Sequence, residues 1–147
     1  ENQSMIQEIK NAITSGMPYL AECGGFMYLH EFMEDMSGNT HSMLGIMKGK
    51  AYKTSKLARF GYIELKSNKT SVLGNEDLFC RGHEFHYFDS TSNGTDFVAR
   101  KPLTNRSWEC IHANENGVAG FPHMYYYSNP QMIVDFLKNC ERTDEGA

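Results

Sequence analysis

The sequence predicts an α/β domain with a mixed sheet and a β-rich middle. Helical patterns stand near both ends of the chain, and short strand-type segments separated by turn residues fill the middle. Helix, strand and helix, then a strand-rich segment, then strand and helix is an order typical of an α/β domain. The length of 147 residues fits one domain.

The first predicted element is an amphipathic helix over residues 4–15. Ser4 and Gln7 have the spacing of a capping box, and Gly16 stands where a helix ends. The apolar positions, at helical spacing, are Met5, Ile6, Ile9, Ala12 and Ile13. The short apolar run 18–22 then predicts a buried strand.

A second helix is predicted next, ending near Asp35. The segment after residue 25 is apolar and rich in methionine, and Gly38 ends it. The side chains that can share one broad helical face are Met27, His30, Phe32 and Met33.

The middle of the chain predicts a series of strands, followed by a last helix. The strand candidates are Met43–Lys50, Phe60–Lys66, Leu78–Phe88, Phe97–Lys101, Ser107–His112 and Val118–Phe121. Asn129 suits the cap of the last helix, and Pro130 suits its first position. The apolar stripe of that helix is Met132, Ile133, Phe136, Leu137 and Cys140.

Composition excludes several classes of partner. The 14 Lys and Arg against 18 Asp and Glu give a net charge of −4, and a weakly acidic domain with scattered charge binds nucleic acid poorly. No apolar run approaches the ~20 residues of a membrane span. The four cysteines contain no CxxC pair, so we expect no zinc site, no disulfide framework and a cytoplasmic location.

The string around Cys23 carries the clearest chemistry. A strand leads into Cys23, two glycines follow, and a helix begins, which is the arrangement of a nucleophile elbow. The N–H of Gly24 could donate to an oxyanion. The helix N-terminus predicts a thiol pKa below the ~8.5 reference. An inert buried cysteine in a strand-to-helix turn stays open as the alternative.

His123 is the candidate base for such a thiol. It follows an apolar strand and a Phe121-Pro122 step, and strand ends are where a parallel sheet presents its site residues. Nothing close to it in sequence is an obvious orienting group, because residue 125 is Tyr rather than a carboxylate. In residues 81–87, alternation puts Glu84 and His86 on one strand face. That pair supplies too few ligands for a metal, so we expect none.

Four strings together resemble a known family, the class-I-like glutamine amidotransferase domain of cobyrinic acid a,c-diamide synthases and cobyric acid synthases. They occur in the family's order and span most of the chain, with the a,c-diamide synthase branch favoured. The matching strings are Gly16–Leu29, Lys56–Tyr62, Arg81–Tyr87 and Gly120–Pro130.

The resemblance implies a fold and a set of roles. The fold would be of the Rossmann or flavodoxin-like class-I amidotransferase type, and the reaction hydrolysis of glutamine to glutamate and ammonia. Cys23 would attack the amide, His123 would move the protons and Gly24 would donate in the oxyanion hole. The remaining candidates for the glutamine site, or for orienting the histidine, are Gly25, Glu84 and His86. The third group of the site is open, since the wider class has a glutamate where this chain has Tyr125.

The resemblance also implies parts beyond this chain. Residues 1–147 would be the C-terminal glutaminase domain, truncated at its N-terminal side, so that the first strands and a second oxyanion donor are missing. No cofactor is expected in this domain, because no P-loop occurs in it. ATP and Mg²⁺ would bind in a synthetase domain of the same polypeptide, which would receive the ammonia and hold the corrinoid acceptor. A homodimer stays open.

Alternatives differ in the acceptor or in the chemistry. The same glutaminase could serve nickel-sirohydrochlorin, cobyric acid synthesis or cell-wall glutamate amidation, because the missing domain would select the acceptor. A non-catalytic domain that keeps the fold is a second class, and another thiol hydrolase on a related α/β fold is a third.

Overall fold

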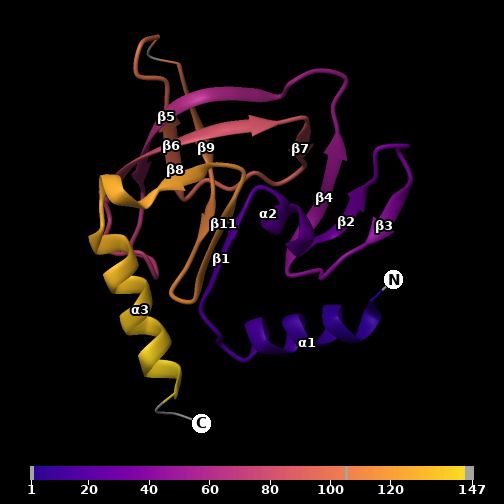
Figure 1. Ribbon diagram of the computed structural model, residues 1–147, viewed down its shortest axis with the longest axis horizontal. Helices are drawn as coiled ribbons and strands as arrows, with labels where there is room; N and C mark the ends of the chain where they lie inside the picture. Colours follow the sequence, from indigo (N-terminus) through magenta and orange to yellow (C-terminus); the bar gives the residue numbers. More distant parts are fainter. Residues whose placement is uncertain (1, 105, 145–147) are drawn as a thin grey trace.

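Three sheets and three α-helices make up the structure, a computed structural model that describes residues 2–104 and 106–144. Figure 1 shows β1 and β11 in the middle of the molecule, with the other strands and the helices around them. The central sheet is mixed: β1 (Tyr19–Glu22) runs parallel to β11 (Gly117–Gly120), and β10 (His112–Ala113) runs antiparallel to β11. This mixed sheet is the part of the fold that positions the candidate site.

Two further sheets flank the central one. A five-stranded antiparallel sheet has the order β12 (His123–Tyr125), β6 (Phe79–His86), β5 (Arg59–Ser67), β8 (Phe97–Arg100) and β9 (Ser107–Cys110). A four-stranded mixed sheet has the order β3 (Thr40–Ser42), β2 (His30–Glu34), β4 (Met47–Lys53) and β7 (Phe88–Ser90). The strand-rich middle of the sequence is therefore confirmed.

The helices at the two ends are also confirmed. The first is α1 (Gln3–Thr14), and its cap is Asn2, whose side chain accepts a hydrogen bond from the Met5 N–H; the capping box predicted at Ser4 is wrong by two residues. The last is α3 (Gln131–Asp144), which begins directly after Pro130. A short 3₁₀ helix, η1 (Tyr126–Ser128), connects β12 to it.

The predicted second helix is wrong beyond Leu29. Helix α2 covers only Gly24–Leu29, and residues 30–34 form β2. This strand obtains backbone partners on both sides, from β3 and β4, which a helix there would lose. The His30 side chain is fully buried and bonds the Phe26 carbonyl at 2.9 Å and the Ser90 hydroxyl at 2.7 Å. Distant pairing thus overrides the helical pattern.

Two hydrophobic cores lie on opposite faces of the central sheet. In β11, Val118 packs into the core shared with the five-stranded sheet and α3, while Ala119 packs into the core shared with α1 and α2. Neighbouring residues of a strand point to opposite faces, so β1 and β11 contribute to both cores. Among the helices of the described residues, none has the length and apolar character to cross a bilayer.

Candidate functional site

Cys23 occupies a strained turn between β1 and α2. Its φ of 50° and ψ of −105° lie in a region that residues other than glycine rarely adopt. Holding a residue in such a backbone conformation costs about 1–3 kcal/mol of folding free energy. The turn is held on both sides, because the Cys23 N–H donates to the Gly120 carbonyl at 2.9 Å and its carbonyl accepts from the Met27 N–H at 3.0 Å. Strain of this kind is typical of functional sites.

Local crowding does not require the two glycines that follow Cys23. A side-chain carbon added at Gly24 would meet nothing within 4 Å, and one at Gly25 would meet Ala21 at 3.6 Å. Gly24 begins α2, and its backbone N–H bonds the Cys23 thiol. The donor expected to stabilise an oxyanion thus already lies at the sulfur.

The predicted low pKa of Cys23 is wrong in direction. Burial raises the pKa of the thiol, and the nearby carboxylates of Glu22 and Glu84 raise it further, against the opposing effect of the Gly24 hydrogen bond. Helix α2 has only six residues, so its N-terminus offsets little of this. The resting thiol is therefore protonated near neutral pH and needs a base.

His123 lies just beyond the end of β11, the strand that pairs with β1. It begins β12, directly opposite His83 on β6, and the two rings stack with centroids 4.9 Å apart. Only Phe121 and Pro122 separate it from the end of β11, the strand that bonds the Cys23 backbone. The ends of two parallel neighbours thus bring the predicted nucleophile and base to one edge of the central sheet.

Glu22, which the sequence reasoning did not single out, contacts the predicted base and is a further candidate. Its Oε2 lies 3.8 Å from Nδ1 of His123, while its Oε1 accepts hydrogen bonds from the Met124 N–H at 3.2 Å and the Tyr126 hydroxyl at 2.6 Å. The available clue was its place as the last strand residue before Cys23. Its contacts are about a hundred residues away in sequence, so local pattern could not show them.

Glu84 and His86 form a separate buried pair. Glu84 Oε1 lies 3.5 Å from His86 Nε2. Nδ1–H of His86 donates to the Phe88 carbonyl at 2.6 Å, and the His86 ring stacks on Phe121. The cavity beside them, which Trp108 also lines, measures about 10 Å³, room for one water rather than an amino acid. The carboxylate at His123 is thus Glu22, where the sequence suggested Glu84.

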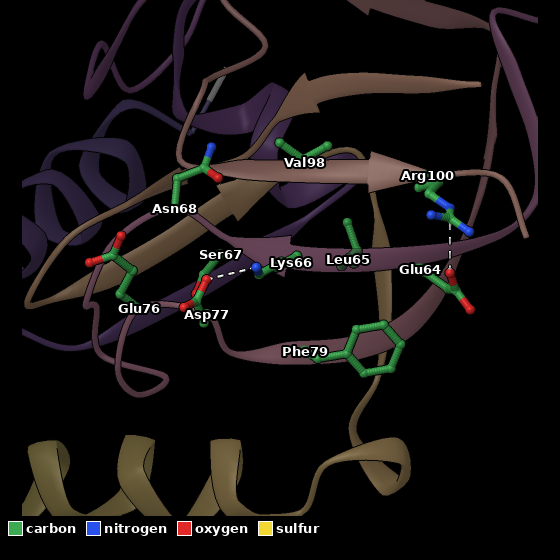
Figure 2. Close-up of a pocket in the computed structure, with 10 residues that line it drawn as sticks. All are labelled: Glu64, Leu65, Lys66, Ser67, Asn68, Glu76, Asp77, Phe79, Val98 and Arg100. Carbon is green, nitrogen blue, oxygen red and sulfur yellow. Dashed lines mark ion pairs between the residues drawn. The ribbon is translucent and has the colours of Figure 1, made fainter. Parts of the chain in front are cut away.

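One cavity of the five-stranded sheet lies away from this chemistry. It measures about 480 Å³ on the outer face of the five-stranded sheet, and Figure 2 shows its two ion pairs, Lys66 with Asp77 and Arg100 with Glu64. Neither Cys23 nor His123 lines it. These two pairs leave Glu76 as the remaining charged side chain of the lining.

A second cavity, of about 380 Å³, contains the predicted base. Its lining residues, mostly aromatic, are Tyr62, Arg81, Gly82, His83, His123, Met124 and Tyr125. We take this hollow, together with the Cys23 turn at the end of the paired strands β1 and β11, as the candidate site on the ground of chemistry. Across residues 2–104 and 106–144, no cluster of three or more His, Cys, Asp or Glu side chains could hold a metal ion.

The two cysteines of the hydrophobic core, Cys80 and Cys110, lack comparable surroundings. Burial raises the pKa of Cys80 to about 12, and burial also raises the pKa of Cys110 strongly. Both lie inside the core between the central and five-stranded sheets. Neither thiol is placed for nucleophilic attack.

Curated proteins are similar to this chain over nearly its whole length. The cobyrinate a,c-diamide synthase of Caldanaerobacter subterraneus subsp. tengcongensis is 38% identical over 142 residues, which are 95% of this chain and 31% of that protein. The cobyrinate a,c-diamide synthase of Clostridium acetobutylicum is 35% identical over 146 residues, or 97% of this chain and 31% of that protein. The chain therefore spans less than a third of the length of these curated relatives.

Fold comparison and family comparison point the same way. A solved structure described as a glutamine amidotransferase matches with a TM-score of 0.59 at 14% identity, over 92% of this chain and 68% of that one, which confirms the predicted fold class. Residues 1–130 match the family of CobB/CobQ-like glutamine amidotransferase domains, as the four strings suggested. The chain therefore belongs to the CobB/CobQ-like glutamine amidotransferase domain family.

Proposed function

We propose that this chain is the glutaminase domain of a cobyrinate a,c-diamide synthase. It would hydrolyse glutamine to glutamate and ammonia, and the ammonia would serve amidation of the a and c carboxylates of cobyrinic acid in cobalamin biosynthesis. The observation that supports this most directly is the strained Cys23 turn beside His123, at φ 50°, in a chain of this family.

The chemistry follows from the placement of the two side chains. The thiol is protonated at rest, so His123 would take its proton as the sulfur attacks the side-chain amide carbon of glutamine. The Gly24 N–H would donate to the oxyanion that forms. Collapse of this intermediate releases ammonia, which takes the proton from His123, and leaves a glutamyl thioester on Cys23.

The second half of the reaction restores the enzyme. His123 would take a proton from water, and the resulting hydroxide would attack the thioester carbonyl. The second tetrahedral intermediate then expels the Cys23 sulfur, which recovers its proton as glutamate leaves. One water is consumed, and the products are glutamate and ammonia.

Synthesis of the amide bond needs a partner part of the polypeptide. The sequence contains no P-loop, so we assign ATP and Mg²⁺ to a synthetase domain outside this chain. The curated relatives have room for it, because this chain matches only 31% of their length. The corrinoid would bind there.

The test uses the full-length protein and a glutamine analogue, 6-diazo-5-oxo-norleucine, that alkylates a glutaminase cysteine. We expect one adduct by intact mass, mapped to Cys23, absent in Cys23→Ser and unchanged in the control Cys140→Ser. Cys23→Ser should lose glutamine-dependent amidation and keep ammonia-dependent amidation. Loss of both activities would make Cys23 structural.

The main competing function differs only in the acceptor. The names of the relatives favour cobyrinate over nickel-sirohydrochlorin, cobyric acid or cell-wall glutamate. Amidation assays with each acceptor would separate these cases. A wild-type protein in which iodoacetamide modifies Cys23 but the glutamine analogue does not would instead indicate a non-catalytic domain.

A further inference from the structure

The carboxylate of Glu22 is fixed by donors that come from the strand and turn just after His123. Its Oε1 accepts from the Met124 N–H at 3.2 Å and from the Tyr126 hydroxyl at 2.6 Å. The other oxygen, Oε2, lies 3.8 Å from Nδ1 of His123. One oxygen is thus held in place, and the other faces the imidazole.

We propose that Glu22 is the positioning residue for His123, fixing the ring so that Nδ1 carries the proton and Nε2 is left to accept one from Cys23. This inference rests on the proposed glutaminase function. An ionised carboxylate only accepts hydrogen bonds, so it favours the tautomer that presents Nδ1–H to it. The distance of 3.8 Å exceeds a hydrogen bond, but such contacts often tighten when substrate binds.

The same carboxylate suits the charge that develops during attack. When Nε2 takes the thiol proton, the ring becomes an imidazolium, and the negative Glu22 beside Nδ1 stabilises it. The ring stacked on His123 is that of His83, which supplies no negative charge. Glu22 also disfavours a standing thiolate, because it raises the pKa of Cys23. Its position therefore favours proton transfer during the reaction over a preformed ion pair.

Other nearby groups cannot take this role from where they lie. Tyr125, two residues after His123, has no carboxylate and lines the same hollow of about 380 Å³ as His123. Glu84 contacts His86 instead. The Tyr126 hydroxyl stays a donor because burial and its contact with Glu22 raise its pKa. The fixed pair of Tyr126 and Glu22 is thus the support that the structure offers to His123.

The decisive variant is Glu22→Gln in the full-length protein. Its carbonyl oxygen can still accept from Met124 and Tyr126, but its amide then presents N–H to Nδ1 and favours the opposite tautomer. We expect kcat for glutamine to fall roughly ten- to a hundredfold, part of the ~10²–10⁴ that a positioned acid–base group contributes, with KM unchanged. Ammonia-dependent amidation should persist.

A direct readout of the tautomer does not depend on activity. In ¹⁵N-histidine NMR spectra, His123 should show Nδ1–H in the wild-type protein and Nε2–H in Glu22→Gln, with His123→Asn to assign the signal. Tyr126→Phe removes one of the two donors, so its kcat should fall by a smaller factor. Glu64→Gln, a carboxylate on the outer face of the five-stranded sheet, is the matched control and should behave as wild type.

The outcomes separate this inference from the function on which it rests. Failure of the wild-type protein to hydrolyse glutamine would reject the proposed function. Hydrolysis by wild type together with normal kcat and an unchanged tautomer in Glu22→Gln would reject the positioning role alone. A raised KM with an unchanged tautomer would place Glu22 in substrate binding or folding, and would also overturn the inference.

Discussion

At the scale of single residues, burial and nearby carboxylates together keep the Cys23 thiol protonated, against the hydrogen bond from Gly24. Sequence reasoning found Cys23 and His123 because each follows a strand in a recognisable string, and it expected a low thiol pKa from the helix N-terminus. Burial and the two nearby carboxylates raise that pKa instead. The sequence could not show this, because burial and the position of Glu84 depend on the packed fold.

From the raised pKa of the Cys23 thiol we predict the behaviour of His123→Ala. Without its base the protonated thiol cannot attack, so turnover of glutamine at pH 7 should fall by about 10²–10⁴, the usual contribution of such a group. As pH rises through the pKa of the thiol, the thiolate forms without help, and part of the loss should be recovered. Turnover measured from pH 6 to 10 checks this. A flat profile for the variant, or near-normal turnover at pH 7, would contradict it.

At the scale of elements, hydrophobic periodicity predicted the helices and strands whose structure is decided by local sequence. Helices α1 and α3 follow from their apolar stripes, and β5 from alternation, since its buried residues Ile63, Leu65 and Ser67 are spaced by two. The prediction failed at residues 30–34, where partners from β3 and β4 decide. The same limit hid Glu22, whose partners in β12 and η1 are distant in sequence.

Gly82 shows how one element places the base. It lies on β6 opposite Met124, and a side-chain carbon there would come within 2.5 Å of the backbone carbonyl of His123. Gly82→Ala should therefore push β12 away, lower glutamine turnover at least tenfold and destabilise the fold by about 1–3 kcal/mol, as overpacking does. Steady-state kinetics and urea denaturation would measure both effects. The control for stability is Gly25→Ala, which should change the free energy of unfolding little, because its new carbon meets Ala21 at 3.6 Å. A Gly82→Ala variant as stable as the wild-type protein would contradict the argument.

At the scale of the whole molecule, the central sheet joins two cores that sequence patterns describe only separately. Phe97 is fully buried in the core with the five-stranded sheet, and Phe26 is fully buried in the core with α1 and α2. Strands β1 and β11 supply side chains to both. A strand cannot lose one face without disturbing the other, so the two cores should unfold together.

This coupling predicts a single transition for the 147-residue chain. Phe97→Ala and Phe26→Ala should each lower the free energy of unfolding by about 3–5 kcal/mol, the usual cost of emptying a buried aromatic site, whereas Leu103→Ala, 96% exposed, should change it little. Fluorescence of Trp108, the only tryptophan, reports the first core, and far-UV circular dichroism reports the helices packed on both. The two urea curves should coincide in every variant. If Phe26→Ala shifted the dichroism curve and left the fluorescence curve in place, the two cores would unfold independently. The Cys23 turn, which depends on both faces of β1, would then open without global unfolding.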